Sequence, residues 1–400
     1  MKVLHLTSGK LSGGAAKGAL RLHKGLLDIG VDSHLCGYNN TQEKIENLIE
    51  WSFFDKIKYS LNRKKNTFDL KHYKHKSDEI FSVGNDLFNC FKHIDFSHYD
   101  IVNLHWVNYS LNIRFIEYLK SQTKVVWTLR DMWPFTGGCH YSLNCIGYKE
   151  VCGDCPKLNS NTETDISNSL LLKKQWAFKD INFIAISNWL KSEALSSTIL
   201  NNSSIDTIYN SVDVSKFNII NDQNTINNIK KIFGIETSKK IIITGAQDVM
   251  DIYKGPDFVR EFIKLHANDF YFIIFGQNAE ILTKGLNLEN IKLVGFQDEP
   301  SLAKLYNIAD YFLMCSVQEG FGKTIVESLA CGTPVITLSG GAPEELILAT
   351  DGGFIWDGES KLDLTSPKTP EKLRLNAKNK FSLETIAKLY KSKYSQITSA

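Results

Sequence analysis

Short apolar runs alternate along the chain with stretches of helical periodicity. The runs in the first half lie at 2–7, 100–106, 125–129 and 181–187, and those in the second half at 239–245, 270–276, 291–296, 311–315 and 334–341. Runs of this length are typical of strands that are buried on both faces. Because helix-like segments separate them, the pattern predicts parallel sheets and an α/β fold.

The strand–helix alternation starts again in the second half, after a polar run at 218–228 that we interpret as a surface link. A chain of 400 residues is long for one domain and suits two α/β domains of ordinary size. The sequence therefore predicts two consecutive α/β domains.

A glycine-rich turn joins the strand at 311–315 to a helix at 324–331. Gly320 and Gly322 allow a ligand to approach the backbone closely. The first amides of a helix, here near Lys323 and Thr324, have no acceptor within the helix and lie at the positive end of its dipole. The turn is therefore suited to bind a phosphate or diphosphate.

Two carboxylates bracket this turn, Glu319 before it and Glu327 one turn into the helix. A carboxylate repels phosphate but accepts strong hydrogen bonds from hydroxyl groups. Diphosphate and hydroxyl-rich groups together describe a nucleotide sugar. An ordinary strand-to-helix connection with solvent-facing glutamates would have the same spacing.

The segment from Glu319 to Val335 resembles the E-x7-E signature of retaining family 4 glycosyltransferases, with Gly-Phe-Gly after the first Glu and Glu-Ser-Leu-Ala-Cys-Gly-Thr-Pro-Val running on from the second. Those enzymes have the GT-B fold, in which two Rossmann-like domains with parallel sheets face each other across a cleft. The resemblance extends from Lys2 to about Tyr394. It implies an N-terminal acceptor-binding domain at 1–205, on which a C-terminal helix at 378–400 packs back, and a nucleotide-sugar-binding domain at 206–377.

The resemblance also implies roles for single residues. Lys254, in a Lys-Gly pair, would meet the donor diphosphate, Glu319 the donor sugar and Glu327 the ribose; the Arg that relatives often carry shortly before this Lys is replaced by Ile252 and Tyr253. The residues expected to bind the donor are Gly14, Lys254, Gly276, Glu319, Gly320, Phe321, Gly322, Lys323, Thr324 and Glu327. The chain has no D-x-D motif, so this interpretation requires no metal or other cofactor for catalysis.

Three polar residues follow strands of the first domain, where ligands bind in open α/β sheets. They are His105, Arg130 and Asp131. Arg130 stands where the resembled family often has a His, and an Arg suits phosphate or acceptor anchoring better than proton transfer. We expect Glu319, Asp131 and Arg130 to act in catalysis, and His105 and His140 to lie on the acceptor side, although a His at a strand end is more often structural.

Four cysteines, Cys139, Cys145, Cys152 and Cys155, fall within one short segment. The closing C-x-x-C is a knuckle of the kind that binds tetrahedral zinc, whereas the C-x5-C before it is looser than usual. A structural zinc site is slightly preferred over unbonded thiols, with disulfides third. The segment resembles an insertion in a subgroup of family 4 enzymes from bacterial surface-polysaccharide assembly. Four thiolate ligands would leave no open position for catalysis.

The segment 51–76 combines basic and aromatic residues. Its cations are Lys56, Lys58, Arg63, Lys64, Lys65, Lys71, Lys74 and Lys76, and its aromatic residues are Trp51, Phe53, Phe54, Tyr59, Phe68 and Tyr73. Such a mixture fits an interfacial helix on an anionic membrane. A solvated basic face is the somewhat favoured alternative, and nucleic acid is a poorer third.

Global properties narrow the function further. The formal net charge is +2, so the chain has no overall bias toward polyanions, and we expect no nucleic-acid partner. The N-terminal apolar run is too short for a signal peptide, and no stretch approaches the length needed to span a bilayer. We expect a cytoplasmic protein with free thiols or bound metal, either fully soluble or peripheral on the inner face of the cell membrane.

These observations, with the resemblance, predict a retaining glycosyltransferase. It would transfer a sugar from a UDP- or GDP-sugar to a glycan or a polyprenyl-diphosphate-linked acceptor, in the biosynthesis of O-antigen (lipopolysaccharide), capsule or exopolysaccharide. The family implies front-side displacement, since the chain offers no convincing nucleophile. A nucleotide-sugar 2-epimerase of the same fold and a non-catalytic sugar-nucleotide-binding protein are the alternatives.

Overall fold

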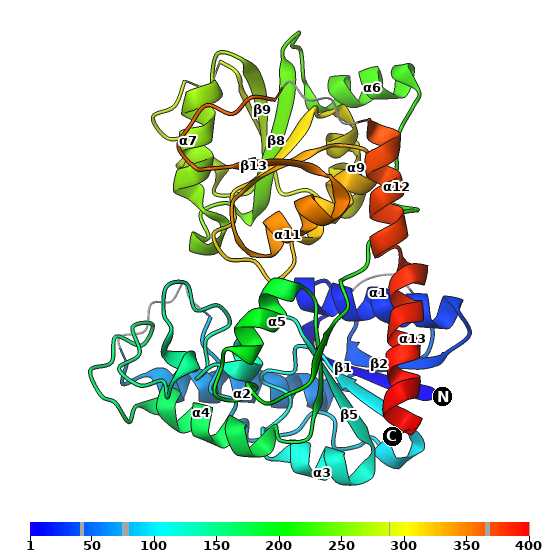
Figure 1. Cartoon of the computed structure of the whole chain (residues 1–400), viewed down its shortest axis with the longest axis vertical. Helices are drawn as coiled ribbons and strands as arrows, with labels where there is room; N and C mark the ends of the chain where they lie inside the picture. The colour runs from blue at the N-terminus through cyan, green and yellow to red at the C-terminus, as the bar shows by residue number, and fades with distance from the viewer. Residues whose placement is uncertain (41–43, 74–79, 288, 365–368, 400) are drawn as a thin grey trace. The chain divides into compact units, whose positions relative to one another are not determined.

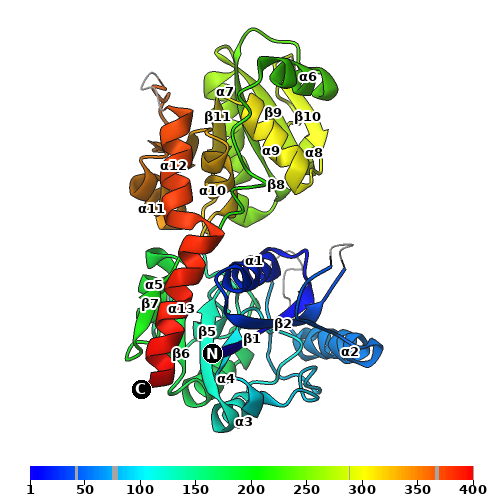
Figure 2. The same ribbon diagram turned by 90° about the vertical axis from the view of Figure 1, so that its right-hand side faces the viewer.

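A computed structural model describes residues 1–40, 44–73, 80–287, 289–364 and 369–399 (Figures 1 and 2). The chain divides into two compact units: Met1–Ser211 together with the segment from Leu383 onward, and Val212–Ser382. A division between residues 205 and 206 would cut strand β7 (Ile205–Thr207), which pairs with β6 (Asn182–Ala185). The chain therefore completes this strand before it leaves the first unit.

The described part of the first unit contains a seven-stranded parallel sheet in the order β3-β2-β1-β4-β5-β6-β7. Besides β6 and β7, its strands are β1 (Lys2–Lys10), β2 (Asp32–Tyr38), β3 (Leu48–Glu50), β4 (Ile101–Leu104) and β5 (Lys124–Leu129). Strands β2 and β3 were not expected, because neither has a continuous apolar run. The strand order reverses between β1 and β4, and such a switch point is where open α/β sheets bind ligands.

Helices of the first unit include the C-terminal one. They are α1 (Gly14–Asp28), α2 (Phe53–Leu70), α3 (Phe115–Gln122), α4 (Ile166–Ala177), α5 (Asn188–Leu195) and α13 (Leu383–Ser399), with short 3-10 turns η1 (Phe96–His98), η2 (Trp133–Phe135) and η3 (Gly147–Lys149). Helix α13 packs beside α1 (Figure 1). Its buried Tyr390 and Tyr394 join a core with Val3 and Leu26, so α13 completes the core of the first unit.

The described part of the second unit has a six-stranded parallel sheet in the order β10-β9-β8-β11-β12-β13. Its strands are β8 (Lys240–Asp248), β9 (Phe270–Gln277), β10 (Ile291–Gly295), β11 (Tyr311–Met314), β12 (Val335–Leu338) and β13 (Gly353–Trp356). The order reverses between β8 and β11, which gives this sheet its own switch point. Two parallel-sheet, Rossmann-like α/β units confirm the predicted fold class.

Helices of the second unit are α6 (Gln223–Phe233), α7 (Pro256–His266), α8 (Ala279–Leu282), α9 (Glu299–Ile308), α10 (Lys323–Ala330), α11 (Gly341–Thr350) and α12 (Pro370–Phe381), with the 3-10 turn η4 (Ile252–Lys254). The polar run at 218–228 is not all link, because Asp222 caps α6 within it. The C-terminal helix expected to begin at residue 378 begins instead at Leu383, because Ser382, in extended backbone, separates it from α12. Among the described helices, none is long and apolar enough to cross a membrane.

Candidate functional site

Two loops meet at the switch point of the second unit, one after β8 and one after β11. The backbone N–H of Val317 donates to the carbonyl of Tyr253 at 3.0 Å. Gly255 has a φ of +63°, and a Cβ there would lie 2.1 Å from the carbonyl oxygen of Cys315. Only glycine fits this position, which explains the residue after Lys254 and fixes the two loops against each other.

This contact brings Lys254 and Glu319 together. The Lys254 Nζ lies 2.7 Å from Oε2 of Glu319, and the lysine side chain is 33% exposed. Burial would lower the pKa of Lys254, but Glu319 and Asp251 hold it above its ordinary value. Burial would likewise raise the pKa of Glu319, but the ammonium and nearby backbone N–H groups hold it below its ordinary value. The pair therefore stays ionised at neutral pH and presents its cation to solvent.

Glu319 also shapes the turn that follows it. Its carboxylate accepts hydrogen bonds from the backbone N–H groups of Phe321 and Gly322. Gly322 has a φ of +90° and stands at the N-cap of α10 without a side-chain cap. No side chain at the N-cap therefore competes for the first amides of α10, beside the half-buried Lys323 and Thr324. Lys254, Glu319 and this helix end form one polar corner, which we call the β8–β11 corner.

The structure also shows the burial and contacts of other residues that were expected to bind the sugar donor. Phe321 is buried, with its ring centroid 5.9 Å from that of Phe381, so only its backbone can face a ligand. Glu327 is 1% exposed, which leaves its ribose contact a prediction. A Cβ on Gly276 would lie 1.9 Å from the carbonyl oxygen of Ala246; this glycine is needed for strand packing. A Cβ on Gly14, at the start of α1, would touch no protein atom.

The switch point of the first unit holds a chain of buried hydrogen bonds. Arg130 donates to Nδ1 of His105, at 3.0 Å from Nη2 and 3.3 Å from Nε. His105 must then carry its proton on Nε2, which donates to Nδ1 of His5 at 2.9 Å. Burial lowers the pKa of both histidines well below its ordinary value. The two imidazoles are neutral, and His105 orients Arg130.

Arg130 has a second partner that the sequence analysis missed. Its Nη1 donates to the side chain of Asn210, which no sequence motif indicated. On helix α1, a Cβ added to Gly18 would lie 2.5 Å from Nη1 of Arg130. The glycine in the helix interior is a signal that could have indicated a close neighbour here.

Asp131 and His140 form a separate contact. Nδ1 of His140 lies 2.6 Å from Oδ2 of Asp131, and its Nε2 lies 2.9 Å from Oγ of Ser82. The other Asp131 oxygen accepts from the backbone N–H of Trp133 at 2.9 Å. The structure thus places the expected residues of the first unit in two pairs, Arg130 with His105 and Asp131 with His140. The second pair ties the end of β5 to the cysteine-rich segment.

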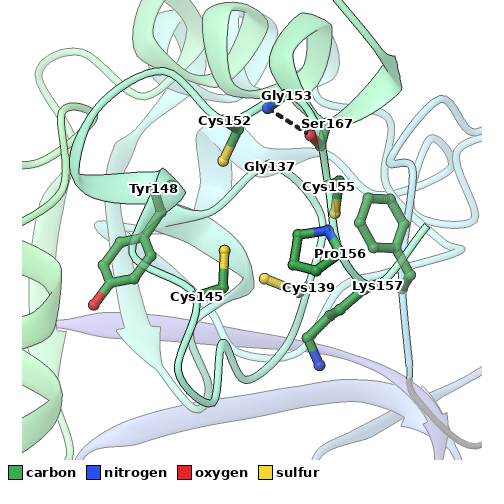
Figure 3. Close-up of a pocket in the computed structure, with 12 residues that line it drawn as sticks. Gly137, Cys139, Cys145, Tyr148, Cys152, Gly153, Cys155, Pro156, Lys157 and Ser167 are labelled. Carbon is green, nitrogen blue, oxygen red and sulfur yellow. Dashed lines mark hydrogen bonds between the residues drawn. The ribbon is translucent and has the colours of Figure 1, made fainter. Parts of the chain in front are cut away.

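The four cysteines of this segment line one pocket with Tyr148, Lys157 and Ser167, and their side chains are directed into it (Figure 3). All four are free of disulfides. Burial raises the pKa of Cys139 to about 11 and that of Cys152 to about 12, which favours neutral thiols. Among the described residues, no three His, Cys, Asp or Glu side chains are placed to hold a metal ion. A zinc site would therefore require the sulfur atoms to converge further than they do in this structure.

Comparisons with known proteins agree with this fold. Residues 225–366 match the family model described as Glycosyl transferases group 1. The putative colanic acid biosynthesis glycosyl transferase WcaC of Escherichia coli K12 is 25% identical over 390 residues, which cover 93% of this chain and 91% of that protein. The O-antigen biosynthesis glycosyltransferase WclY of Escherichia coli is 34% identical over 138 residues, 32% of this chain and 36% of WclY.

Solved structures share this fold. The crystal structure of Anabaena Alr3699/HepE in complex with UDP-glucose has a TM-score of 0.66 at 16% identity, and the match covers 99% of this chain and 100% of that chain. The fold of the present chain is therefore GT-B. The residues that match the glycosyl transferases group 1 model, 225–366, lie in the second unit and include the β8–β11 corner.

Proposed function

We propose that the protein is a retaining glycosyltransferase that takes a sugar from a nucleotide-diphosphate sugar. The observation that carries this proposal is the β8–β11 corner, where an ionised Lys254–Glu319 pair lies beside the uncapped start of α10. A diphosphate is bound by a cation and by the N-terminal end of a helix, and a sugar is bound by a carboxylate acceptor. The corner supplies all three within one group 1 domain.

In the proposed reaction, an acceptor hydroxyl oxygen attacks the anomeric carbon of the donor sugar. The bond from that carbon to the diphosphate breaks on the same face, and the acceptor proton passes to the departing phosphate oxygen. Negative charge grows on the diphosphate as the bond breaks. Lys254 and the first amides of α10 are fixed before the reaction, so they stabilise this charge without reorganising. Glu319 orients the sugar hydroxyls and holds Lys254.

For the first unit we propose acceptor binding. Arg130 is a buried cation held by His105 and Asn210, and a guanidinium of fixed orientation is suited to an anionic acceptor group. The names of WcaC and WclY, colanic acid and O-antigen biosynthesis, favour a cell-surface polysaccharide intermediate. A glycan or a lipid-diphosphate-linked saccharide meets both requirements. The donor is a UDP- or GDP-sugar, with UDP favoured by the HepE complex.

The test combines donor binding with turnover. A thermal-shift screen of UDP- and GDP-sugars should single out one donor, because a ligand that binds only the native state raises the unfolding temperature. With that donor and a saccharide acceptor, NMR of the product should show the anomeric configuration of the donor. Glu319→Gln should lower kcat/KM by roughly 100-fold or more. Glu261→Gln, which breaks an exposed pair with Lys264, is the matched control and should have no effect.

Two results would overturn the proposal. Release of an epimerised sugar from the donor without any acceptor would assign the protein to the 2-epimerase alternative. Donor binding without turnover across a panel of acceptors, unchanged by Glu319→Gln, would indicate a binding protein.

A further inference from the structure

Helix α2 buries two polar residues, whereas several of its large apolar residues are exposed. Phe53, Phe54 and Phe68 are 72%, 71% and 59% exposed, whereas Asp55 and Asn62 are buried. A helix on a protein surface in contact with water normally shows the opposite arrangement. Figure 2 shows α2 at the periphery of the first unit. Its outer face therefore exposes large apolar side chains that a surface helix normally buries.

Hydrogen bonds on the inner side hold α2 in this orientation. The side chain of Asn62 donates to the carbonyls of Phe88 and Tyr109 and accepts from the backbone N–H groups of Leu87 and Phe88, at distances from 2.8 to 3.2 Å. One turn later, Asn66 donates to one backbone group of the same loop and accepts from another. Rotating the helix to bury its phenylalanines would leave these groups unsatisfied, which is costly. The apolar face is fixed outward.

The exposed apolar residues form a continuous stripe. Phe53, Ile57 and Leu61 are spaced by four residues and lie on one side of the helix, and Phe68 follows two turns later on the same side. Ile57 and Leu61 are also exposed. In the adjoining loop, which Asn62 binds through its backbone, the side chains of Leu87 and Phe88 are exposed as well. Phe53, Phe54, Ile57, Leu61 and Phe68 make the apolar face of α2.

Positive charge accompanies this face. Lys58 and Lys65 are paired with Asp55 and Asp69. Arg63, Lys64 and Lys71 are exposed and take part in none of the ion pairs found in the described residues. Lys64 falls on the apolar stripe itself, three residues after Leu61 and four before Phe68, and Lys71, at the C-cap, follows three residues after Phe68. Lys74 and Lys76, which the sequence analysis grouped with them, lie outside the described residues.

We propose that α2 docks on the surface of an anionic phospholipid membrane, lying flat in the interface with its phenylalanines among the acyl chains. Long basic side chains beside an apolar stripe reach outward to lipid phosphates while their stems stay in apolar surroundings. A partner protein could cover the apolar residues, but the exposed cations among them select an anionic surface. The inference does not depend on the transferase proposal, since docking requires neither donor nor acceptor.

Vesicle sedimentation with the full chain tests this proposal. We expect binding to phosphatidylcholine vesicles that contain one quarter phosphatidylglycerol, weaker binding at 0.5 M than at 0.1 M salt, and little binding to pure phosphatidylcholine. Arg63→Gln/Lys64→Gln should weaken the partition coefficient roughly 25-fold, since each cation near the surface contributes about fivefold. Phe53→Ser/Phe54→Ser should weaken it at least tenfold.

The controls lie on α6 of the other unit. Ile232 is also highly exposed, so Ile232→Ser matches the phenylalanine change, and Lys230→Gln/Lys231→Gln matches the charge change; neither should alter binding. All substituted side chains are exposed or half-buried, so equal unfolding temperatures will confirm that the variants fold. Absence of binding to the anionic vesicles would overturn the proposal, as would binding that the α2 variants leave unchanged. Self-association abolished by Phe53→Ser/Phe54→Ser, without vesicle binding, would assign the face to a second copy of the chain.

Discussion

Lys254 and Arg130, the cations at the two switch points, have different kinds of hydrogen-bond partner. Lys254 is paired with one carboxylate and remains partly exposed, so an incoming diphosphate can reach it. Arg130 is 8% exposed and held by neutral partners, with no carboxylate among the hydrogen bonds of its side chain that the structure describes. A cation without a counter-charge is well suited to an anionic ligand. This contrast is the basis for assigning donor and acceptor roles to the two residues.

The position of Arg130 can be changed without touching it. Gly18→Ala places a methyl group against its guanidinium, while alanine favours the helix. We expect the free energy of unfolding to change by less than about 1 kcal/mol and the transfer rate to fall at least tenfold through a higher KM for the acceptor. A double-mutant cycle with Arg130→Ala provides the control. If Gly18→Ala lowers the transfer rate by the same factor with and without the Arg130→Ala change, the glycine does not act through Arg130.

Asp86 should give the protein a pH-dependent stability. It is 5% exposed, and burial raises its pKa to about 7 in spite of hydrogen bonds from the backbone N–H groups of Tyr109 and Leu111. From its ordinary value up to about 7, the folded state retains a proton that the unfolded state releases. The contribution of this group to the free energy of unfolding therefore falls as pH rises through that range and is constant above it.

Asp86→Asn removes this titration. At pH 8 it should raise the free energy of unfolding by about 2 kcal/mol, and at pH 5 by clearly less, as urea denaturation will measure. The result would contradict the assignment if the two pH values gave the same difference between the variant and the unmodified protein.

Among the elements, the cysteine-rich segment is the one whose structure is hardest to predict from the sequence. Cys139, Cys145, Cys152 and Cys155 line one pocket, as a common binding site for the four side chains requires. Among the described residues, however, they are not placed to hold a metal ion. Two glycines hold the segment closely: a Cβ on Gly137 would lie 2.5 Å from the carbonyl oxygen of Ser167, and one on Gly153 would lie 2.0 Å from that of Glu163. The segment is packed as a specific structure and is not a flexible insertion.

Metal analysis decides between zinc and free thiols. If the sequence-based prediction holds, elemental analysis of protein purified without chelator will find about one zinc per chain, and Cys152→Ser/Cys155→Ser will lose it. Unfolding temperature with and without a chelator gives a second measure. If the protein contains no metal and the thiols of the segment react with a thiol reagent after unfolding, the cysteines are free thiols, as in the structure. Cys36→Ser, outside the segment, is the control.

For the whole molecule, the two units differ in how they are completed. The second unit builds its core from a single stretch of chain, with Phe262, Phe272 and Trp356 at its centre. The first unit needs α13, whose Tyr394 hydroxyl lies 2.6 Å from Nδ2 of Asn103 and whose Tyr390 hydroxyl lies 3.1 Å from Oγ1 of Thr128. Folding of the first unit therefore depends on a segment that follows the second unit in the sequence.

A chain ending at residue 382 tests this dependence. Without α13 the core around Val3 and Leu26 is open, so we expect the first unit to lose its cooperative melting transition while the second unit keeps its own. Calorimetry can separate the two transitions. Tyr394→Phe, which removes one hydrogen bond and keeps the ring, should lower the free energy of unfolding by only about 1 kcal/mol. A first unit that melts in the truncated chain as it does in the full chain would contradict the expectation.

The sequence alone determined the fold class and the identity of the chemical groups. Continuous apolar runs predict buried parallel strands because both faces of each strand must be apolar, and glycines after a strand predict a helix start open to a ligand. Partly polar strands such as β2 were not predicted, because they lack a continuous apolar run and are stabilised by pairing with strands elsewhere in the sequence. The break at Ser382 was not predicted either, because both flanking segments are good helix formers.

Only the tertiary structure decided which groups meet. It paired Lys254 with Glu319, gave Arg130 its partner Asn210, and made His105 a residue that orients Arg130. It also turned α2 so that its phenylalanines are exposed, because Asn62 binds the loop backbone on the inner side. The residues of a helix and their spacing can be read from the sequence. Which face is buried depends on hydrogen bonds to segments that only folding brings alongside.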